Sequence, residues 1–427
     1  MTKTTNSKAS GLREKTKEFW DVLGPGLITG ASDDDPSGIA TYSQAGAGFG
    51  LSTLWTALLT FPLMAAVQEM CARMGAVTSQ GLTGILKKHY SRTVILIMVV
   101  FSFPAIVLNI GADLEGMGAV AHLIIPGLPI YAAEIGFTFL LIVGIIRFSY
   151  QRIASILKWL CLVLILYLII PFLVVDLDWG MVVRNTFFPN VHLNRDFFEI
   201  LVAILGTTIS PYLFFWQTTM EAEDVNNSKK HIVVDRNFLQ KMQADIFTGM
   251  FFSNLVMFFV ILTTGVVLFN AGQFKIETVE QAAQALKPLA GDATYLLFAL
   301  GILGTGFLAI PVLAGALSYT VAEAFNWSEG LQKKFTQAPG FYLTIIISLL
   351  AGLFLDFLNI NPIKALLYTA ILYGLTAPVL IGIILHICNN KQVMGEAVNG
   401  NWSNILGLLA FILMTLAGVA LIWFQFA

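Results

Sequence analysis

Apolar residues run in long blocks along the chain, and short polar stretches separate the blocks. Each block is long enough for a helix to cross ~30 Å of hydrocarbon. With 57% hydrophobic and 12% charged residues and a mean hydropathy of +0.78, the chain departs from soluble domains, in which about 25% of residues are charged. The pattern predicts an all-α integral membrane protein with eleven spans, near residues 22–48, 51–76, 93–123, 130–147, 154–176, 197–222, 242–270, 292–322, 340–357, 362–388 and 403–426.

Basic residues are distributed unequally between the two sides of the predicted spans. Of the 24 Lys and Arg residues, 19 fall on the side of the N-terminal tail and five on the other. Because cytoplasmic loops carry the excess of Lys and Arg, we expect the N-terminus in the cytoplasm and the C-terminus outside. The polar tail 1–19 lacks the apolar core of a signal peptide. These features predict a multi-pass protein of the cell (inner) membrane.

The first apolar block is interrupted at its centre by the residues DDDPSG, which begin at Asp33. A carboxylate at this depth costs at least ~2.5 kcal/mol, so it usually marks an ion pathway or a substrate site. Pro36 lacks the N–H that a helix needs and Gly38 adds backbone freedom, so the helix is expected to break after Asp35. Backbone groups freed at such a break are available to a bound ion.

The sixth block carries a second interruption, because Pro211 lies in mid-span directly after Ser210. The two prolines lie five spans apart, and since five is odd the two interrupted spans cross the bilayer in opposite directions. Paired interrupted helices in corresponding halves of a chain indicate an inverted-repeat transporter with a site near the membrane midplane.

The stretch LGPGLITGASDDDPSGIATYSQAGAGFG resembles the first helix of the natural resistance-associated macrophage protein (NRAMP) divalent-metal transporters. The matching positions there are Asp35, Pro36, Ala40, Thr41, Gln44, Ala45, Gly46 and Ala47, and further matches are Gln68, Ala72, Arg73, Gly75, Val77, Thr78, Leu205, Gly206, Thr208 and Pro211. The resemblance implies a LeuT-type fold, in which a five-plus-five inverted repeat with broken helices 1 and 6 precedes an eleventh helix. The implied divisions are a tail 1–19, repeats 20–178 and 179–390, and the extra helix 391–427.

Two departures from the family pattern bear on the choice of ion. The family's Asn ligand in the first helix is Gly38 here, and its Met ligand in the sixth helix is Ser210. This pattern resembles the NRAMP-related magnesium transporter branch. A thioether favours late transition metals, whereas carboxylate, carbonyl, hydroxyl and water suit Mg²⁺, which keeps several waters when bound. We therefore expect a Mg²⁺ site, with Mn²⁺ also accepted, at Asp35, Ser37, Gly38, Thr207 and Ser210.

Two further departures bear on proton coupling. The family's His after the sixth-helix proline is Tyr212 here, and a phenol with a reference pKa near ~10 does not titrate usefully at neutral pH. In the third block Asp113 is kept, but Gly116 replaces the family's second acid and Glu115 stands one residue short. These changes predict ion movement without proton coupling. The candidate pathway or vestibule residues are Asp33, Asp34, Asp113, Glu115, Tyr212, Gln217 and Asn254.

Several alternatives remain open at this stage. Asp33 and Asp34 either line the ion cavity or face the intracellular vestibule, and Asn254 either contributes an amide to the outer vestibule or bridges helices. Glu69 and Arg73, four residues apart on one helix, form a simple ion pair in the plainest interpretation. The expected partners are a divalent cation as substrate and the lipid bilayer, without cofactor or nucleic acid, and the chain is expected to be a monomer.

The main alternative function is a proton-coupled importer of Mn²⁺ or Fe²⁺. An organic-solute carrier of the same fold is disfavoured by Asp35, because amino-acid carriers use glycine-rich backbone at the break to hold a carboxylate. An intramembrane enzyme is disfavoured because the sequence contains no nucleophile elbow, paired His-Glu zinc helix or phosphate-binding glycine loop.

Overall fold

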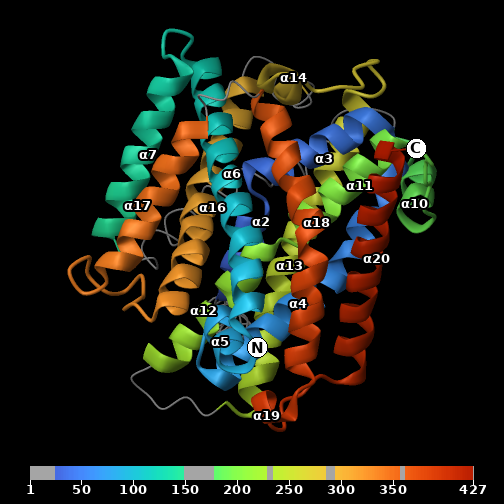
Figure 1. The fold of residues 1–427 in the computed structure, drawn as a ribbon. Helices are drawn as coiled ribbons and strands as arrows, with labels where there is room; N and C mark the ends of the chain where they lie inside the picture. The colour runs from blue at the N-terminus through green and yellow to red at the C-terminus, as the bar shows by residue number, and fades with distance from the viewer. Residues whose placement is uncertain (1–24, 149–176, 228–233, 285–293, 356–360, 427) are drawn as a thin grey trace, which may run out of the picture.

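The computed structural model describes residues 25–148, 177–227, 234–284, 294–355 and 361–426. These residues form helices and their connections, seen in Figure 1. In chain order the elements are α2 (Pro25–Asp33), α3 (Pro36–Phe49), the 3₁₀ turn η1 (Gly50–Thr53), α4 (Trp55–Thr78), α5 (Leu82–His89), α6 (Arg92–Ile124), α7 (Ile130–Arg147), α10 (Trp179–Phe187), α11 (Arg195–Thr208), α12 (Pro211–Asn227), α13 (Arg236–Val267), α14 (Val279–Gln284), α16 (Thr294–Phe325), α17 (Pro339–Phe354), α18 (Pro362–Cys388), α19 (Lys391–Met394) and α20 (Asn401–Phe426).

Ten of the eleven predicted spans coincide with helices, and the remaining one, 154–176, lies outside the described residues. Both predicted breaks are confirmed, between α2 and α3 and between α11 and α12. The boundaries differ where a helix extends beyond its apolar part. The span predicted from residue 242 begins at Arg236, because hydropathy marks only the lipid-buried length and the helix continues through polar residues. The span predicted from residue 51 begins at Trp55, because η1 turns the chain between α3 and α4.

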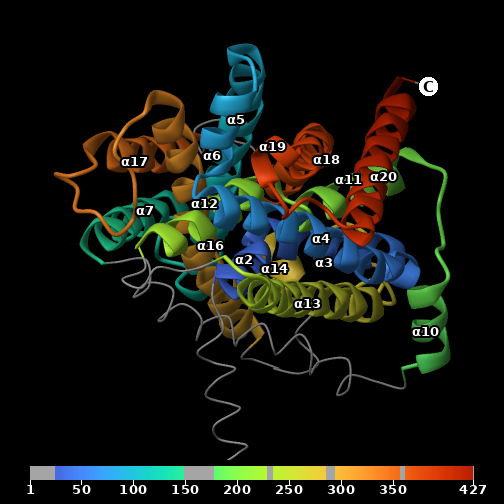
Figure 2. The same ribbon diagram turned by 90° about the horizontal axis from the view of Figure 1, so that it is seen from below.

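The broken α11–α12 span lies inside the bundle together with the continuous helix α16, whereas α7 and α20 lie at its edge. In the most apolar 18-residue window, 83% of the α11–α12 span is buried within the protein, against 28% for α7 and 33% for α20. Figure 2 shows α7 and α17 on one flank and α20 with α10 on the other. The polar interruptions are therefore enclosed by protein, and the exposed apolar faces of the flanking helices suit contact with lipid.

Helix α2 packs against α13 through backbone rather than side chains. A Cβ atom added to Gly30 would lie 2.4 Å from the carbonyl oxygen of Gly249, and one added to Gly249 would lie 2.3 Å from the carbonyl oxygen of Gly26. Small residues permit such close approach of membrane helices. At the same contact, the N–H of Gly26 donates to Oδ2 of Asp245 at 2.7 Å, so a carboxylate of α13 caps the start of α2.

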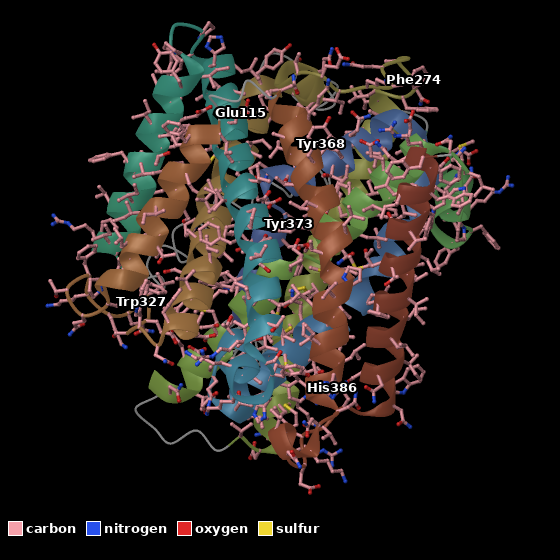
Figure 3. All side chains as sticks on the ribbon, viewed as in Figure 1. Glu115, Phe274, Trp327, Tyr368, Tyr373 and His386 are labelled. Atoms are coloured by element: carbon pink, nitrogen blue, oxygen red, sulfur yellow. The ribbon has the colours of Figure 1, made fainter. Side chains whose placement is uncertain are left out.

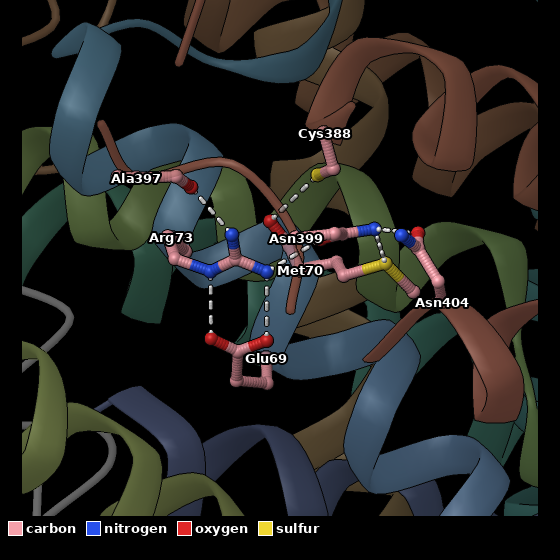
Figure 4. Close-up of polar contacts among 7 residues, drawn as sticks. All are labelled: Glu69, Met70, Arg73, Cys388, Ala397, Asn399 and Asn404. Atoms are coloured by element: carbon pink, nitrogen blue, oxygen red, sulfur yellow. Dashed lines mark hydrogen bonds and ion pairs between the residues drawn. The ribbon is translucent and has the colours of Figure 1, made fainter. Parts of the chain in front are cut away.

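The last helix, α20, packs against α18, α11 and α4, and Arg73 of α4 binds the segment that leads into it (Figure 4). The guanidinium binds both carboxylate oxygens of Glu69, with Nε–Oε1 and Nη2–Oε2 distances of 2.8 and 3.1 Å, which confirms the predicted pair. It also donates to the carbonyl of Ala397 at 2.5 Å and to Oδ1 of Asn399 at 2.6 Å. Asn399 in turn donates to Oδ1 of Asn404 in the first turn of α20 at 2.8 Å. Arg73 therefore connects α4 with the segment between α18 and α20.

Candidate ion site

The first break is shaped by Asp35 and Pro36. Pro36 occupies the first turn of α3, where a missing N–H costs no helical hydrogen bond. Asp35 is the N-cap, with extended backbone at φ −67° and ψ 171°, and its Oδ1 accepts from the N–H of Gly38 at 2.7 Å. The sequence DDDPSG therefore ends one helix at Asp33 and starts another at Pro36, with the Asp35 carboxylate fixed between them.

The second break lies between Thr208 and Pro211. Because Pro211 supplies no N–H, carbonyls in the last turn of α11 lack their usual helical donors. The hydroxyl of Ser210 lies within reach of two of these carbonyls, 3.1 Å from the Gly206 oxygen and 2.5 Å from the Thr207 oxygen. Ser210 thus uses its single proton within α11, and its oxygen lone pairs remain acceptors.

The two breaks lie side by side. The hydroxyl of Tyr212, in α12, donates to the carbonyl of Ser32, in α2, at 2.9 Å, and Tyr42 and Thr208 join their hydroxyls at 3.2 Å. A Cβ atom added to Gly38 would lie 3.3 Å from Oγ1 of Thr207. The carboxyl ends of α2 and α11 therefore meet near Asp35, and helix carboxyl ends carry partial negative charge that favours a cation.

Four carboxylates are buried around the first break. Asp33 and Asp113 are 0% exposed, and Asp34 and Asp35 are 2% exposed. Ser253 of α13 lies 2.8 Å from Oδ2 of Asp33 and 3.4 Å from Oδ1 of Asp34. Asp113, on α6, is an electrostatic neighbour of Asp35 and also interacts with the backbone N–H of Ser37.

No basic side chain of the described residues balances these four acids. The ion pairs in the described ranges join Arg73 to Glu69 and Arg195 to Glu199, and neither pair includes one of the four. An uncompensated buried charge costs several kcal/mol. The arrangement therefore requires positive charge from outside the side chains, either a metal cation or protons.

The remaining predicted pathway residues lie at different distances from the breaks. Glu115 is partly exposed and, two positions after Asp113, projects from another face of α6. Figure 3 shows Glu115 near one end of α6. Tyr373, on α18, lies at mid-height, and its ring is 5.8 Å from that of Tyr212. Glu115 therefore lies on a different face of α6 from Asp113.

The two predicted amides lie between helices. Asn254 accepts from Thr60 of α4 at 2.7 Å and donates to Sδ of Met64 at 3.2 Å, so the helix-bridging alternative describes its position. Gln217 accepts from Thr29 of α2 and donates to Glu221 at 2.9 Å. Gln217 thus joins α12 to α2 on the side of the break that leads to the Asp245 cap.

Three residues of the site were missed in the sequence. Asn109 of α6 donates to Oδ2 of Asp35 at 2.9 Å, Thr369 of α18 lies 3.1 Å from Oδ1 of Asn109, and Ser253 contacts two of the acids. One signal was available, because Asn109 precedes Asp113 by four residues and therefore shares its helix face. The hydroxyl of Ser37, predicted to contact the ion, donates to the carbonyl of Leu366 at 2.9 Å.

Two interrupted spans that meet at a buried acidic centre define an inverted-repeat type of membrane transporter. Comparison with known proteins makes the assignment specific. The chain belongs to the natural resistance-associated macrophage protein-like family, whose profile matches residues 26–424.

Relatives of known name cover nearly the whole chain. It is 25% identical over 411 residues to the divalent metal cation transporter MntH of Caldanaerobacter subterraneus subsp. tengcongensis, covering 95% of this chain and 93% of that protein. It is 24% identical over 411 residues to the MntH of Acidiphilium cryptum, covering 93% and 90%.

Solved structures share the fold. A manganese transporter of Eremococcus coleocola, in complex with an aromatic bis-isothiourea substituted compound, superposes with a TM-score of 0.73 at 16% identity, covering 94% of this chain and 86% of that one. MhsT in complex with L-phenylalanine superposes with a TM-score of 0.61 at 11% identity, covering 95% and 98%. These likenesses establish the LeuT-type fold.

Proposed function

We propose that this protein carries a divalent metal cation across the membrane by alternating access. The observation that carries the proposal is the group of four buried carboxylates, Asp33, Asp34, Asp35 and Asp113, which no described basic side chain balances. A divalent cation beside Asp35 would supply two of the four positive charges needed and would also bind the carbonyls at the ends of α2 and α11. All four acids are at most 2% exposed, which fits a conformation closed on both sides.

The transported ion has two candidates. Mn²⁺ is supported by the relatives, which include a manganese transporter and divalent metal cation transporters. Mg²⁺ is supported by the donor chemistry, because Ser210 and Gly38 stand where the family has Met and Asn. Carboxylate, carbonyl and water ligands suit both ions. The comparisons favour Mn²⁺ over the Mg²⁺ expected from the sequence, and we propose Mn²⁺ as a substrate with Mg²⁺ as its main competitor.

Proton coupling also has a physical argument on each side. Tyr212 uses its hydroxyl to bridge to Ser32, which fits the expected absence of a titrating group at this position. The four carboxylates favour the alternative, because buried acids that lose their metal must be neutralised by protons. One divalent ion supplies two positive charges, so its arrival would displace protons from the cluster. We therefore propose that the metal competes with protons for this site.

Alternating access implies further features of this chain. We propose that residues 20–178 and 179–390 act as the two inverted repeats, with the tail 1–19 in the cytoplasm and the last helix ending outside. The excess of basic residues on the tail side supports this orientation. Figure 1 shows that α20 ends on the opposite side of the bundle from α5 and α19. A monomer is the simplest unit that contains the complete site.

The test is uptake of Mn²⁺ and Mg²⁺ into proteoliposomes, with a metal-quenched dye and a pH dye inside. We expect wild type to take up Mn²⁺, Asp35→Asn to lose uptake, and Asp235→Asn, which alters an exposed helix cap, to retain it. Saturation by each ion then ranks Mn²⁺ and Mg²⁺. Absence of ion flux in folded wild type would refute the transport proposal, and metal uptake that is independent of pH would refute the competition with protons.

A further inference from the structure

Helix α10 is held to the rest of the protein by few contacts. It has nine residues, Trp179–Phe187, and among them only Val182 is buried. It packs against α4 and η1, and the amide of Asn190, just beyond the helix, donates to the hydroxyl of Ser52 at 3.3 Å. An isolated helix shorter than ~12–15 residues is marginal in water. Another surface is therefore needed to stabilise α10.

A stripe of large apolar side chains runs along the exposed face of α10. Trp179, Val183 and Phe187 follow one another at a spacing of four residues, so they share a helix face. They are 44%, 55% and 62% exposed. Further exposed apolar side chains follow directly after the helix, at Phe188, Val191 and Leu193. A contiguous exposed apolar patch of this kind marks a surface that contacts protein or membrane rather than water.

The level of α10 matches the apolar part of the spans. Figure 1 shows α10 at the height of the last turns of α20, and Figure 2 shows it at the edge of the bundle. These last turns of α20 expose Trp423 and Phe426. Because Trp is enriched where the hydrocarbon of a membrane meets water, both elements suit the boundary of the bilayer on the side where α20 ends.

The charged residues of α10 are compatible with this boundary. Arg184 is exposed, directly follows Val183, and belongs to neither ion pair of the described ranges. An arginine can lay its stem along apolar surface while its guanidinium reaches the headgroups, where it can bind phosphate. Asp178, the acid of this helix, caps its first turn by accepting from the N–H of Met181 at 3.1 Å.

We propose that α10 lies in the boundary layer of the bilayer, with the stripe of Trp179, Val183 and Phe187 in lipid and Arg184 at the phosphates. An amphipathic helix in this position buries its apolar face ~5–10 Å into the boundary between headgroups and acyl chains. Nine residues are too few to span the membrane, which takes about 20. Because α10 packs against η1, lipid thereby supports the turn between α3 and α4, whichever ion the protein carries.

The experiment measures the quenching of single fluorescent labels on cysteine variants in proteoliposomes. Val183→Cys and Phe187→Cys report on the stripe, Ile412→Cys on the exposed middle of α20, and Ser328→Cys on an exposed polar turn. The quenchers are a nitroxide at the lipid headgroup, a nitroxide near the end of the acyl chain, and iodide in the water.

The native thiols do not interfere with this measurement. Cys161→Ser is present in every variant, and the other two native cysteines, Cys71 and Cys388, are buried. Thermal unfolding of each labelled variant shows whether it is folded, and Phe187→Cys decides the matter if Val183→Cys does not fold.

We expect the headgroup nitroxide to quench both stripe labels several-fold more strongly than the Ser328→Cys label, and the acyl-chain nitroxide to act best on the Ile412→Cys label. Strong quenching of the stripe labels by iodide, without quenching by either nitroxide, would place α10 in water and overturn the proposal. Shielding from all three quenchers would overturn it as well, by assigning the stripe to a protein contact. That contact is a second copy of this chain if dilution in excess lipid relieves the shielding.

Discussion

Asp35 has two functions at the first break, since it caps α3 and supplies the acid at the meeting point of two helix ends. Most N-cap residues lie at a surface where water completes their hydrogen bonds, but Asp35 is 2% exposed. Its oxygens are held by Gly38 and Asn109, which keep the carboxylate in place when no ion is bound. A ligand fixed in advance loses little conformational freedom on binding an ion.

At Ser210, replacing the hydroxyl oxygen by a sulfur atom should change which ion the site prefers. Ser210→Met would replace a hydroxyl by a thioether beside the Thr207 carbonyl, which the hydroxyl now covers at 2.5 Å. Because soft sulfur ligands favour Cd²⁺ over Mg²⁺, we expect the Cd²⁺ dissociation constant to fall about tenfold or more and Mg²⁺ uptake to decrease. Isothermal titration with Cd²⁺ and uptake of Mg²⁺ in one preparation measure both effects. Unchanged Cd²⁺ binding in folded protein would place Ser210 away from the ion.

Gly38→Asn should behave differently, because the site has little space for a side chain there. An added Cβ would lie 3.2 Å from the Asp33 carbonyl and 3.3 Å from Oγ1 of Thr207. These atoms must move by a few tenths of an ångström to admit it, so we expect lower uptake of every ion rather than a change of preference. Uptake of Mg²⁺ and Mn²⁺ by Gly38→Asn and wild type tests this. A selective loss of Mg²⁺ with intact Mn²⁺ uptake would show instead that the amide acts as a ligand.

The sequence predicted the residues of the breaks but not those that approach from other helices. Asp35, Pro36 and Pro211 interrupt apolar blocks, and such interruptions are visible without a structure. Asn109 and Thr369 are single polar residues in apolar helices, and helical spacing does not say which neighbour such a residue meets. Their partnership depends on how α6 and α18 pack against α3, which is a tertiary property.

Among the elements, α2 is held to α13 by the Asp245 cap as well as by the glycine contacts. Asp245→Asn keeps the shape of the cap on Gly26 but removes its charge. We expect amide hydrogens of α2 to exchange about tenfold faster, because a capping interaction contributes ~1 kcal/mol or more. Hydrogen–deuterium exchange of peptides covering residues 25–33 measures this. Asp235→Asn is the control, and equal exchange in wild type and Asp245→Asn would exclude a capping role.

The turn after α16 predicts a pH effect on stability. Glu329 lines a cavity of about 580 Å³ with Glu223 and Glu323, and burial followed by the charge of Glu223 raises the pKa of Glu329 from 4.5 to about 7, although Lys333 opposes the shift. The folded protein therefore holds this proton more tightly than the unfolded chain. Its stabilising effect is complete below pH 4.5 and is lost as the pH rises through about 7.

Glu329→Gln should remove this pH dependence. We expect the Tm of wild type in detergent to decrease between pH 4.5 and 7 relative to that of the variant, with the two curves parallel above this interval. Thermal unfolding over a series of buffers gives the measurement. Parallel curves throughout would mean that Glu329 has its ordinary pKa in the folded protein.

At the scale of the molecule, one buried arginine holds the segment that leads into α20. Breaking a buried ion pair by removing one partner costs ~3–5 kcal/mol, so Arg73→Gln is expected to lower the Tm markedly by leaving Glu69 and the Ala397 carbonyl without their donor. Glu69→Gln combined with Arg73→Gln should recover part of the loss, since no unpaired charge remains. Thermal unfolding of both variants tests this. If the double variant is less stable than Arg73→Gln, the unpaired Glu69 carboxylate is not the cause of the lost stability.

The overall architecture was predictable because lipid imposes strict rules on sequence. Span lengths and the two breaks follow from hydropathy and proline, whereas the direction of the spans, inferred from the basic residues, stays a prediction. The Glu69–Arg73 pair was also predictable, because its members are four residues apart. The attachment of Arg73 to Ala397 and Asn399 was not, because more than 300 residues separate the partners, as the separations of 324 and 326 show.

The contact between α2 and α13 has a consequence for how this protein tolerates mutation over time. A methyl group on Gly30 would meet backbone atoms of Gly249, and one on Gly249 would meet the backbone of Gly26 and Leu27. A clash with a side chain is relieved when that side chain shrinks, but a clash with backbone has no side chain to shrink. A screen for second-site suppressors of Gly30→Ala should therefore yield revertants and no compensating change at position 249. These two helices can diverge in sequence everywhere except along the line where they touch.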